Sequence, residues 1–196
     1  MDALELIRSR RSTRSYRDTP VEPEKLQAVV EAGRYAPSGG NSQTTHFFVI
    51  QDQDVLAELA GTVQACFAEM ETTPDMYASM ARAITRSKKG GYVFHYGAPV
   101  LIVCANRRDY PNNLADCACA QENMMLMANA LDLGSCWINQ LRWLNEDERL
   151  LRRFRELGMG EDECIFASMA LGYPATENGL PERQPLSRKG NPVTMV

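Results

Sequence analysis

Eight residues near the middle of the chain, PVLIVCAN at 99–106, restrict the possible folds more than any other segment. The run is apolar and rich in Val, Leu and Ile, and it does not alternate between apolar and polar side chains. A strand with one face in water alternates, whereas a strand buried on both faces reads as a continuous apolar run. The segment therefore predicts a strand that is covered on both faces.

Helices are predicted on both sides of this strand in the sequence. Apolar side chains recur at helical spacing through residues 113–131. Shorter patterns predict helices at 2–9, 23–36, 54–69 and 145–157. Asp2 is a candidate cap for the first helix, with Leu4 and Ile7 as its apolar face, and Asn145 with Glu148 forms a capping-box variant at the start of the last.

Three further strands are expected, at HFFVI (46–50), from SCWI (135–138) and at IFASMALGY (165–173). The polar, weakly periodic residues 70–96 predict either helices or a mobile excursion. About four strands among five or six helices favour an α+β fold. With 196 residues, the chain is long enough for one sizeable core, so a single domain over 1–196 is predicted.

Composition excludes several classes of protein. Charged residues make up 23% of the chain and the net charge is −4, which argues against general nucleic-acid binding. No apolar run approaches the eighteen or so residues of a membrane span. The first residues, MDALELIRSRRS, contain no apolar segment of a signal peptide, so a cytoplasmic location is expected.

The six cysteines form no C-x-x-C pair, and the two histidines have no neighbour at ligand spacing. Buried free thiols are therefore expected, and no metal site is predicted. On a helix, Cys117 and Cys119 would point to different faces.

The first polar cluster is RRSTR at 10–14. In an extended segment Arg10, Ser12 and Arg14 project to one side, and two guanidinium groups with a hydroxyl suit a phosphate or a polyol. Taken alone, the cluster is more typical of a solvated basic patch.

Three other clusters are of similar kind. Residues 36–43, APSGGNSQ, combine glycines with amides that could meet the pyrimidine edge of a flavin, or form a plain turn. Residues 134–140, GSCWINQ, could lay backbone amides along a ring, or form a core strand packed around Trp137. In the tail, SRKGN at 187–191 could close over a phosphate or keep the terminus soluble.

Together these segments resemble the nitroreductase family of FMN proteins, over nearly the whole chain and in the same order. The segments that carry the resemblance are RRSTRSY, APSGGNSQTTHFFVI, DCACAQENMMLMANALDLGSCWI and ALGYP with SRKGNPV. The resemblance implies a nitroreductase-like α+β fold with a central, mainly antiparallel sheet flanked by helices. It also implies an intertwined homodimer with an FMN at each of two subunit interfaces.

The resemblance also implies the cofactor-binding residues. The phosphate and ribityl chain would be held by the basic residues and serine Arg10, Arg11, Ser12, Arg14, Arg188 and Lys189. The flavin of the other subunit would be reached by Pro37, Ser38, Gly39, Asn41 and Gln43. The ring would lie along Trp137, Ile138, Asn139 and Gln140, with the Gln140 amide facing flavin N5.

Two positions depart from the family pattern. Asn139 and Gln140 stand where many relatives have Glu-Gly or a Gly, which puts a side-chain role at this edge in doubt. Thr44 and Thr45 stand where a Pro and an aromatic residue often follow the Gln, which would reshape the floor of the pocket.

The function implied is transfer of electrons from NAD(P)H to a small oxidised acceptor such as a nitroaromatic or a quinone, by a ping-pong mechanism. No G-x-G-x-x-G motif follows a strand, so one site would serve both substrates in turn. No side-chain acid or base is named, because solvent can supply protons. Two alternatives remain: other flavin chemistry in the same fold, such as dehalogenation or flavin destruction, and non-enzymatic flavin binding.

Overall fold

The apolar run at the centre of the sequence forms β2 (Val100–Arg107), an inner strand of a four-stranded sheet. The computed structural model describes residues 2–196. The strand order is β1-β2-β4-β3, and every pairing is antiparallel. The other strands are β1 (His46–Ile50), β3 (Gly134–Ile138) and β4 (Glu163–Gly172).

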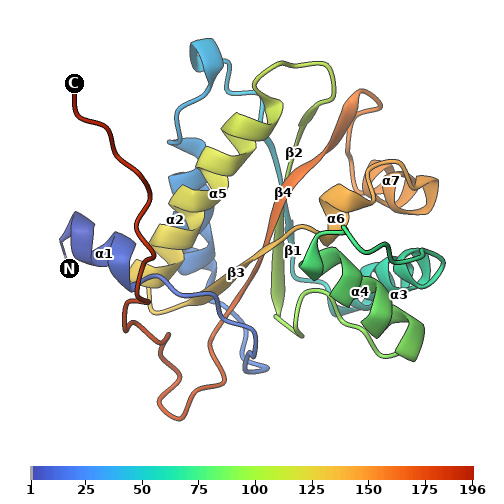
Figure 1. Ribbon diagram of the computed structural model, residues 1–196, viewed down its shortest axis with the longest axis horizontal. Coiled ribbons are helices and arrows are strands. Elements are labelled where there is room, and N and C mark those ends of the chain that lie inside the picture. Colours follow the sequence, from blue (N-terminus) through green and yellow to red (C-terminus); the bar gives the residue numbers. More distant parts are fainter. Residues whose placement is uncertain (1) are drawn as a thin grey trace.

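Each face of β2 is buried under a different group of helices, which confirms the prediction from its sequence (Figure 1). Val100, Ile102 and Cys104 pack with α2 (Pro23–Arg34) and α5 (Asn113–Ala130). The alternate residues Leu101, Val103 and Ala105 pack on the opposite side. That side is covered by α3 (Gln53–Ala68), α4 (Ala78–Lys89) and α7 (Glu148–Glu156).

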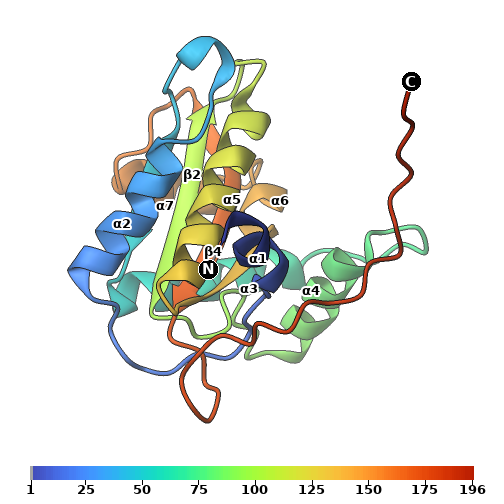
Figure 2. The same cartoon turned by 90° about the vertical axis from the view of Figure 1, so that its left-hand side faces the viewer.

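The first helix is shorter than its neighbours and lies at one end of α5 (Figure 2). α1 (Ala3–Ser9) begins where predicted, because the Asp2 carboxylate accepts the backbone N–H of Glu5 at 2.8 Å. Its expected apolar face is not covered by this chain, however. Leu4 is 54% exposed and Ile7 is 53% exposed.

Two features near residue 140 differ from the sequence prediction. A short helix, α6 (Gln140–Trp143), follows β3 directly and was not predicted. Asn145 does not cap the next helix; Asp147 does, by accepting the N–H of Arg149 at 2.9 Å. The Asn145 amide instead pairs with the backbone of Ile165, whose N–H donates to Oδ1 at 2.9 Å and whose carbonyl accepts from Nδ2. Ile165 lies at a register shift between β2 and β4, where the strand ladder is interrupted.

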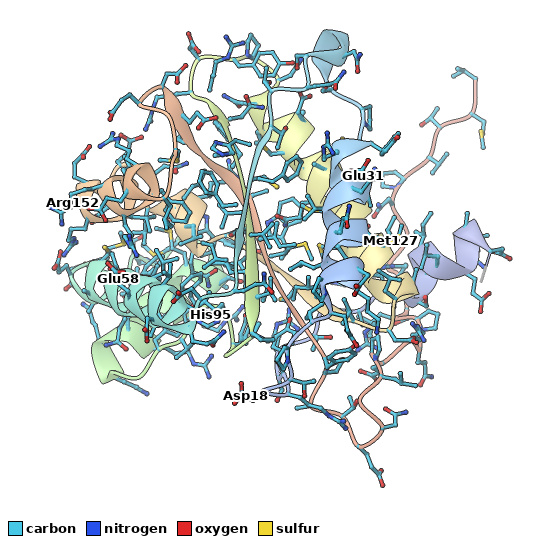
Figure 3. The ribbon with its side chains drawn as sticks, turned by 180° about the vertical axis from the view of Figure 1, so that it is seen from behind. Asp18, Glu31, Glu58, His95, Met127 and Arg152 are labelled. Atoms are coloured by element: carbon cyan, nitrogen blue, oxygen red, sulfur yellow. The ribbon has the colours of Figure 1, made fainter. Side chains whose placement is uncertain are left out.

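Residues 70–96 contain α4, which confirms the helical alternative for this segment. Phe94 and His95, which follow the helix, are buried, and His95 lies between the sheet and the helices of this side (Figure 3). Burial lowers the pKa of the His95 imidazole. The segment is therefore anchored to the core by its C-terminal part.

All six cysteines are free thiols. Five are buried as predicted, and burial raises the pKa of Cys117 to about 12. Cys119 is exposed on the other face of α5, so the prediction of burial is wrong for this residue. Among residues 2–196, no helix has the length and apolar character needed to cross a membrane.

The pairing of Asn145 with Ile165 gives a stability prediction. Asn145→Ala leaves the N–H and the carbonyl of Ile165 without their side-chain partner, which should lower the free energy of unfolding by about 1–3 kcal/mol. Urea denaturation followed by circular dichroism measures the change. Asn191→Ala, in the exposed tail, is the control and should stay within about 0.5 kcal/mol of the wild type. Equal losses in both variants would contradict the role of Asn145.

Candidate functional site

A basic cavity lies where the segment after α1 passes β3. Ser12 forms an isolated parallel bridge with Ser135, and the Thr13 N–H donates to the Ser135 carbonyl at 2.9 Å. This pairing holds the RRSTR segment extended, which is the condition under which Arg10, Ser12 and Arg14 project to one side. The cavity has a volume of about 260 Å³ and is lined by Arg10, Arg11, Ser12, Arg14, Leu186 and Arg188.

The positive charge of this cavity is only partly neutralised by the chain. The Nε atom of Arg10 lies 3.7 Å from Glu122 Oε1, and its Nη1 atom is buried without a hydrogen-bond partner. Within the described part of the chain, no carboxylate lies within ion-pair distance of Arg14 or Arg188. A buried guanidinium donor without an acceptor is costly, and several converging guanidinium groups suit an anion with several oxygens.

Arg11 lines the same cavity but is already engaged with the C-terminal tail. Its Nη1 donates to the Gln184 carbonyl at 2.8 Å, and its Nη2 lies 3.3 Å from Glu182. These contacts hold the tail where Arg188 reaches the cavity. Lys189 is exposed and is not among the residues that line it.

The close approach between this segment and β3 requires a glycine. A Cβ atom at Gly134 would lie 2.5 Å from Thr13 Oγ1. Tyr16 closes the same region, since its hydroxyl donates to the Thr13 carbonyl at 2.8 Å. Burial raises the pKa of Tyr16 well above its usual value, so this hydroxyl stays protonated as a donor.

The loop at residues 36–43 is built around a buried carboxylate. Asp116 Oδ1 accepts the N–H of Gly39 at 3.1 Å, and the Tyr110 hydroxyl lies 3.1 Å from both Asp116 Oδ2 and the Gly39 carbonyl. The Gln43 N–H donates to Ser38 Oγ at 3.1 Å, and Asn41 and Gln43 have φ of 55° and 51°. Left-handed backbone at non-glycine residues is held only when surrounding contacts fix it.

This loop and the basic cavity lie at opposite ends of α5 (Figure 1). Asp116 belongs to the first turn of the helix, whereas Asn129 in its last turn donates to Ser9 Oγ at 2.9 Å, next to Arg10. The two residues are 13 positions apart, which corresponds to about 20 Å of helix, and the Arg10 side chain extends part of this way, to Glu122. Pro37, Ser38 and Gln43 line a separate cavity of about 150 Å³. One chain therefore does not bring the first two clusters together.

The third cluster forms β3 and the turn into α6. The Trp137 indole Nε1 donates to Asn139 Oδ1 at 2.8 Å. Gln140 uses its whole amide: Oε1 accepts the Asn139 N–H at 3.1 Å, and Nε2 donates to the Tyr92 hydroxyl at 2.7 Å. The backbone N–H of Gln140, at the first position of a helix, has no acceptor within the helix.

Three residues that hold the arginine segment and the 36–43 loop in place were not predicted from the sequence: Tyr16, Tyr110 and Asp116. Asp116 could have been found, because it is a charged residue next to Cys117 on the buried face of a predicted helix. The tyrosines carry no such signal, since their partners lie in segments far away along the chain.

Comparison with known proteins places this geometry in a family. The nitroreductase family profile matches residues 7–173. A crystal structure of a nitroreductase with bound FMN from Bacteroides fragilis superposes with a TM-score of 0.86, at 33% identity and with 100% of each chain covered. A second, from Desulfitobacterium hafniense and also with bound FMN, gives a TM-score of 0.82 at 26% identity, covering 98% of this chain and 97% of the other.

A nitrobenzene nitroreductase from Ectopseudomonas oleovorans is 27% identical in sequence, over 92% of this chain and 89% of its own length. The chain belongs to the nitroreductase family. Its α+β fold with an antiparallel sheet and flanking helices, expected from the resemblance, is confirmed.

The loop at residues 36–43 gives a prediction at Gly39. A Cβ atom there would lie 2.7 Å from the Tyr110 hydroxyl, which is held by Asp116 and the Gly39 carbonyl. It would also lie 2.0 Å from Nδ2 of Asn112, an exposed side chain that can turn away. Gly39→Ala should therefore displace the loop and lower the free energy of unfolding by about 1–3 kcal/mol, with faster proteolytic cleavage in the loop. The matched control is Gly61→Ala on α3, where a Cβ meets nothing within 4 Å. It should be neutral or stabilising by up to about 1 kcal/mol; a loss there equal to that of Gly39→Ala would refute the steric argument.

Proposed function

We propose that this protein is an FMN-dependent oxidoreductase that transfers electrons from NAD(P)H to a small oxidised organic molecule, such as a nitroaromatic or a quinone. The observation that carries the proposal is the basic cavity, in which Arg10 has a buried guanidinium nitrogen without a partner. Family membership and the FMN bound in the two compared structures support FMN as its occupant.

The cavity fits the phosphate end of this cofactor. Arg10, Arg14 and Arg188 would supply donors to the phosphate oxygens, and Ser12 a hydroxyl to the phosphate or the ribityl chain. Arg11 would act mainly by holding the tail, because its guanidinium is engaged with Glu182 and Gln184. Lys189, exposed beside Arg188, would contribute charge near the phosphate.

The flavin ring would lie along the strand that leaves this cavity. β3 starts beside Ser12 and leads through Trp137 and Ile138 to the α6 turn. The free N–H of Gln140 is suited to donate to flavin N5. The side chains of Asn139 and Gln140 are occupied by Trp137 and Tyr92, so this edge would act through its backbone.

The loop at 36–43 would serve the cofactor of a second subunit. Because the loop and the basic cavity lie at different parts of α5 and share no lining residue, a flavin held in that cavity would meet the loop of another copy. Pro37, Ser38 and Gly39 would contact that flavin, with Asn41 and Gln43 holding the loop. The exposed Leu4 and Ile7 of α1 provide apolar surface for a homodimer.

When bound, FMN would supply the redox chemistry between the nicotinamide and the acceptor. The chain binds and orients it: the arginines fix the phosphate, and the Gln140 N–H fixes one ring edge. Positive charge near the pyrimidine side would favour the reduced, anionic form. Both substrates would use one open face in turn, which gives ping-pong kinetics.

The phosphate assignment predicts a selective effect of Arg14→Glu. The Kd for FMN should rise about 10–100-fold, because a charge-assisted contact is lost and a repulsion is gained. Riboflavin lacks the phosphate, so its Kd should change less than about twofold. Flavin fluorescence titration measures both values. The control with the same charge change is Arg152→Glu on α7, on the far side of the molecule from α1 (Figure 3). An unchanged Kd for FMN in Arg14→Glu would refute the phosphate assignment.

The activity is tested by steady-state kinetics of the FMN-loaded protein. NADH and NADPH are varied against nitrofurazone and menadione, and parallel double-reciprocal lines are expected for a ping-pong reaction. Turnover of neither acceptor with either nicotinamide would contradict the reductase. Tight FMN binding without turnover would indicate a flavin-binding protein, and irreversible bleaching after reduction in air would indicate flavin destruction.

A further inference from the structure

A second basic cavity, separate from the proposed phosphate site, lies at the C-terminal end of α4. Its volume is about 360 Å³, and it is lined by Arg86, Lys89, Gly90, Gly91, Tyr92, Val93 and Tyr96. We call it the α4 cavity.

The charge around the α4 cavity contrasts with that of the whole chain. The sequence of α4, ASMARAITRSKK, contains four cations and no acid, whereas the chain has a net charge of −4. Two of the four cations have partners: Lys88 lies 2.6 Å from Glu71, and Arg82 donates to Ser79. These two do not line the cavity.

Arg86 and Lys89 line the cavity and are not neutralised by the chain. In the described residues, no carboxylate lies within 4 Å of either side chain. The two unpaired charges at one cavity therefore favour an anionic group as ligand.

The same cavity touches the proposed flavin strand through its aromatic residues. The Tyr92 hydroxyl accepts from Gln140 Nε2 at 2.7 Å, at the turn where β3 ends. Tyr96 lies near enough to Tyr16 to influence the pKa of the Tyr16 hydroxyl. Arg14, which lines the phosphate cavity, influences the same pKa. The α4 cavity is thus aromatic on the side of Gln140 and cationic on the side of the helix end.

We propose that the α4 cavity binds the acceptor, and that the acceptor is a small aromatic acid: a nitroaromatic or quinone that carries a carboxylate. Its carboxylate contacts Arg86 and Lys89, and its ring lies beside Tyr92 and Tyr96. The proposal rests on the proposed function, because it places the reducible group near the Gln140 turn. Cavities of about 150 Å³ accept a single benzene ring, so 360 Å³ is ample for a substituted ring.

The reaction with such an acid balances with the reactants already named. NAD(P)H is the reductant and supplies the equivalent of a hydride, and solvent supplies a proton. A nitro group gains these two electrons and two protons in total, one N–O bond breaks, and the oxygen leaves as water to give the nitroso acid. The carboxylate takes no part in the chemistry and serves only for binding.

The test compares 4-nitrobenzoate with nitrobenzene, which has the same ring and no charge. The double variant Arg86→Gln/Lys89→Gln removes two charges from the cavity. Arg82→Gln/Lys88→Gln removes two charges from the same helix but outside the cavity, and is the matched control. The ratio of kcat/KM for 4-nitrobenzoate to that for nitrobenzene should fall at least about tenfold in the first variant, and less than about twofold in the control.

A readout independent of turnover keeps this proposal distinct from the proposed function. Isothermal titration of the oxidised FMN-loaded protein with 4-nitrobenzoate should show binding that the cavity variant loses and the control keeps. If the wild type binds the acid in this way but reduces neither compound, the reductase proposal fails and the acid site stands.

The acid site would be overturned by no binding of 4-nitrobenzoate by the wild type, by an equal loss in both double variants, or by an unchanged selectivity ratio in the cavity variant. A loss confined to the KM of NADH or NADPH would also overturn it, because the cations would then serve the phosphates of the nicotinamide nucleotide.

Discussion

The arrangement of this protein depends on one strand that has no face left for water. Because both faces of β2 are apolar, each must be covered by helices, and the chain supplies α2 with α5 on one side and α3, α4 and α7 on the other. The two sides have different tasks in the proposed site. α5 carries the support of the 36–43 loop at one end and contacts the end of α1 at the other. On the opposite side, the segment that follows α4 brings Tyr92 to the end of β3.

The proposed cofactor site is assembled from parts that are distant in sequence, and a few backbone contacts join them. Pairing of Ser12 with Ser135 fixes the arginine segment against β3, and Arg11 holds the tail that carries Arg188. The bond from Gln140 to Tyr92 joins the same strand to the α4 region. The departure from the family pattern at Asn139 and Gln140 thus has a structural use here, since both side chains serve contacts within the protein.

The sequence predicted the elements whose signals are local. The apolar run of β2, the periodicity of α5 and the Asp2 cap each depend on neighbouring residues, and all three are confirmed. Asn145 was misassigned because an Asn before a helix can cap it or bind elsewhere, and the strand interruption that attracts it lies 20 residues further along the chain. The exposure of Leu4 and Ile7 was not predictable either, because periodicity shows that a face is apolar and not what covers it.

The residues of the candidate site also divide into those that the sequence predicts and those that only the fold reveals. The arginine segment could be read from the sequence because its residues share one side of an extended backbone, and the structure places Arg10, Ser12 and Arg14 at one cavity. The role of Asp116, by contrast, depends on a loop 77 residues earlier in the chain. Only the assembled fold reveals that the 36–43 loop and the arginine segment line separate cavities.

The composition of β2 has a further consequence, for chains that have not yet folded or have lost their fold. Residues 100–105, VLIVCA, are uncharged and rich in β-branched side chains, a composition typical of segments that stack between molecules into cross-β aggregates. In the native sheet both edges of β2 are occupied, by β1 and by β4, so that no other chain can pair with it. Pro99 and Arg107 stand at its two ends, where a proline and a charge act against such stacking. The strand that organises the native protein is thus also the segment most prone to aggregate when it is exposed during refolding.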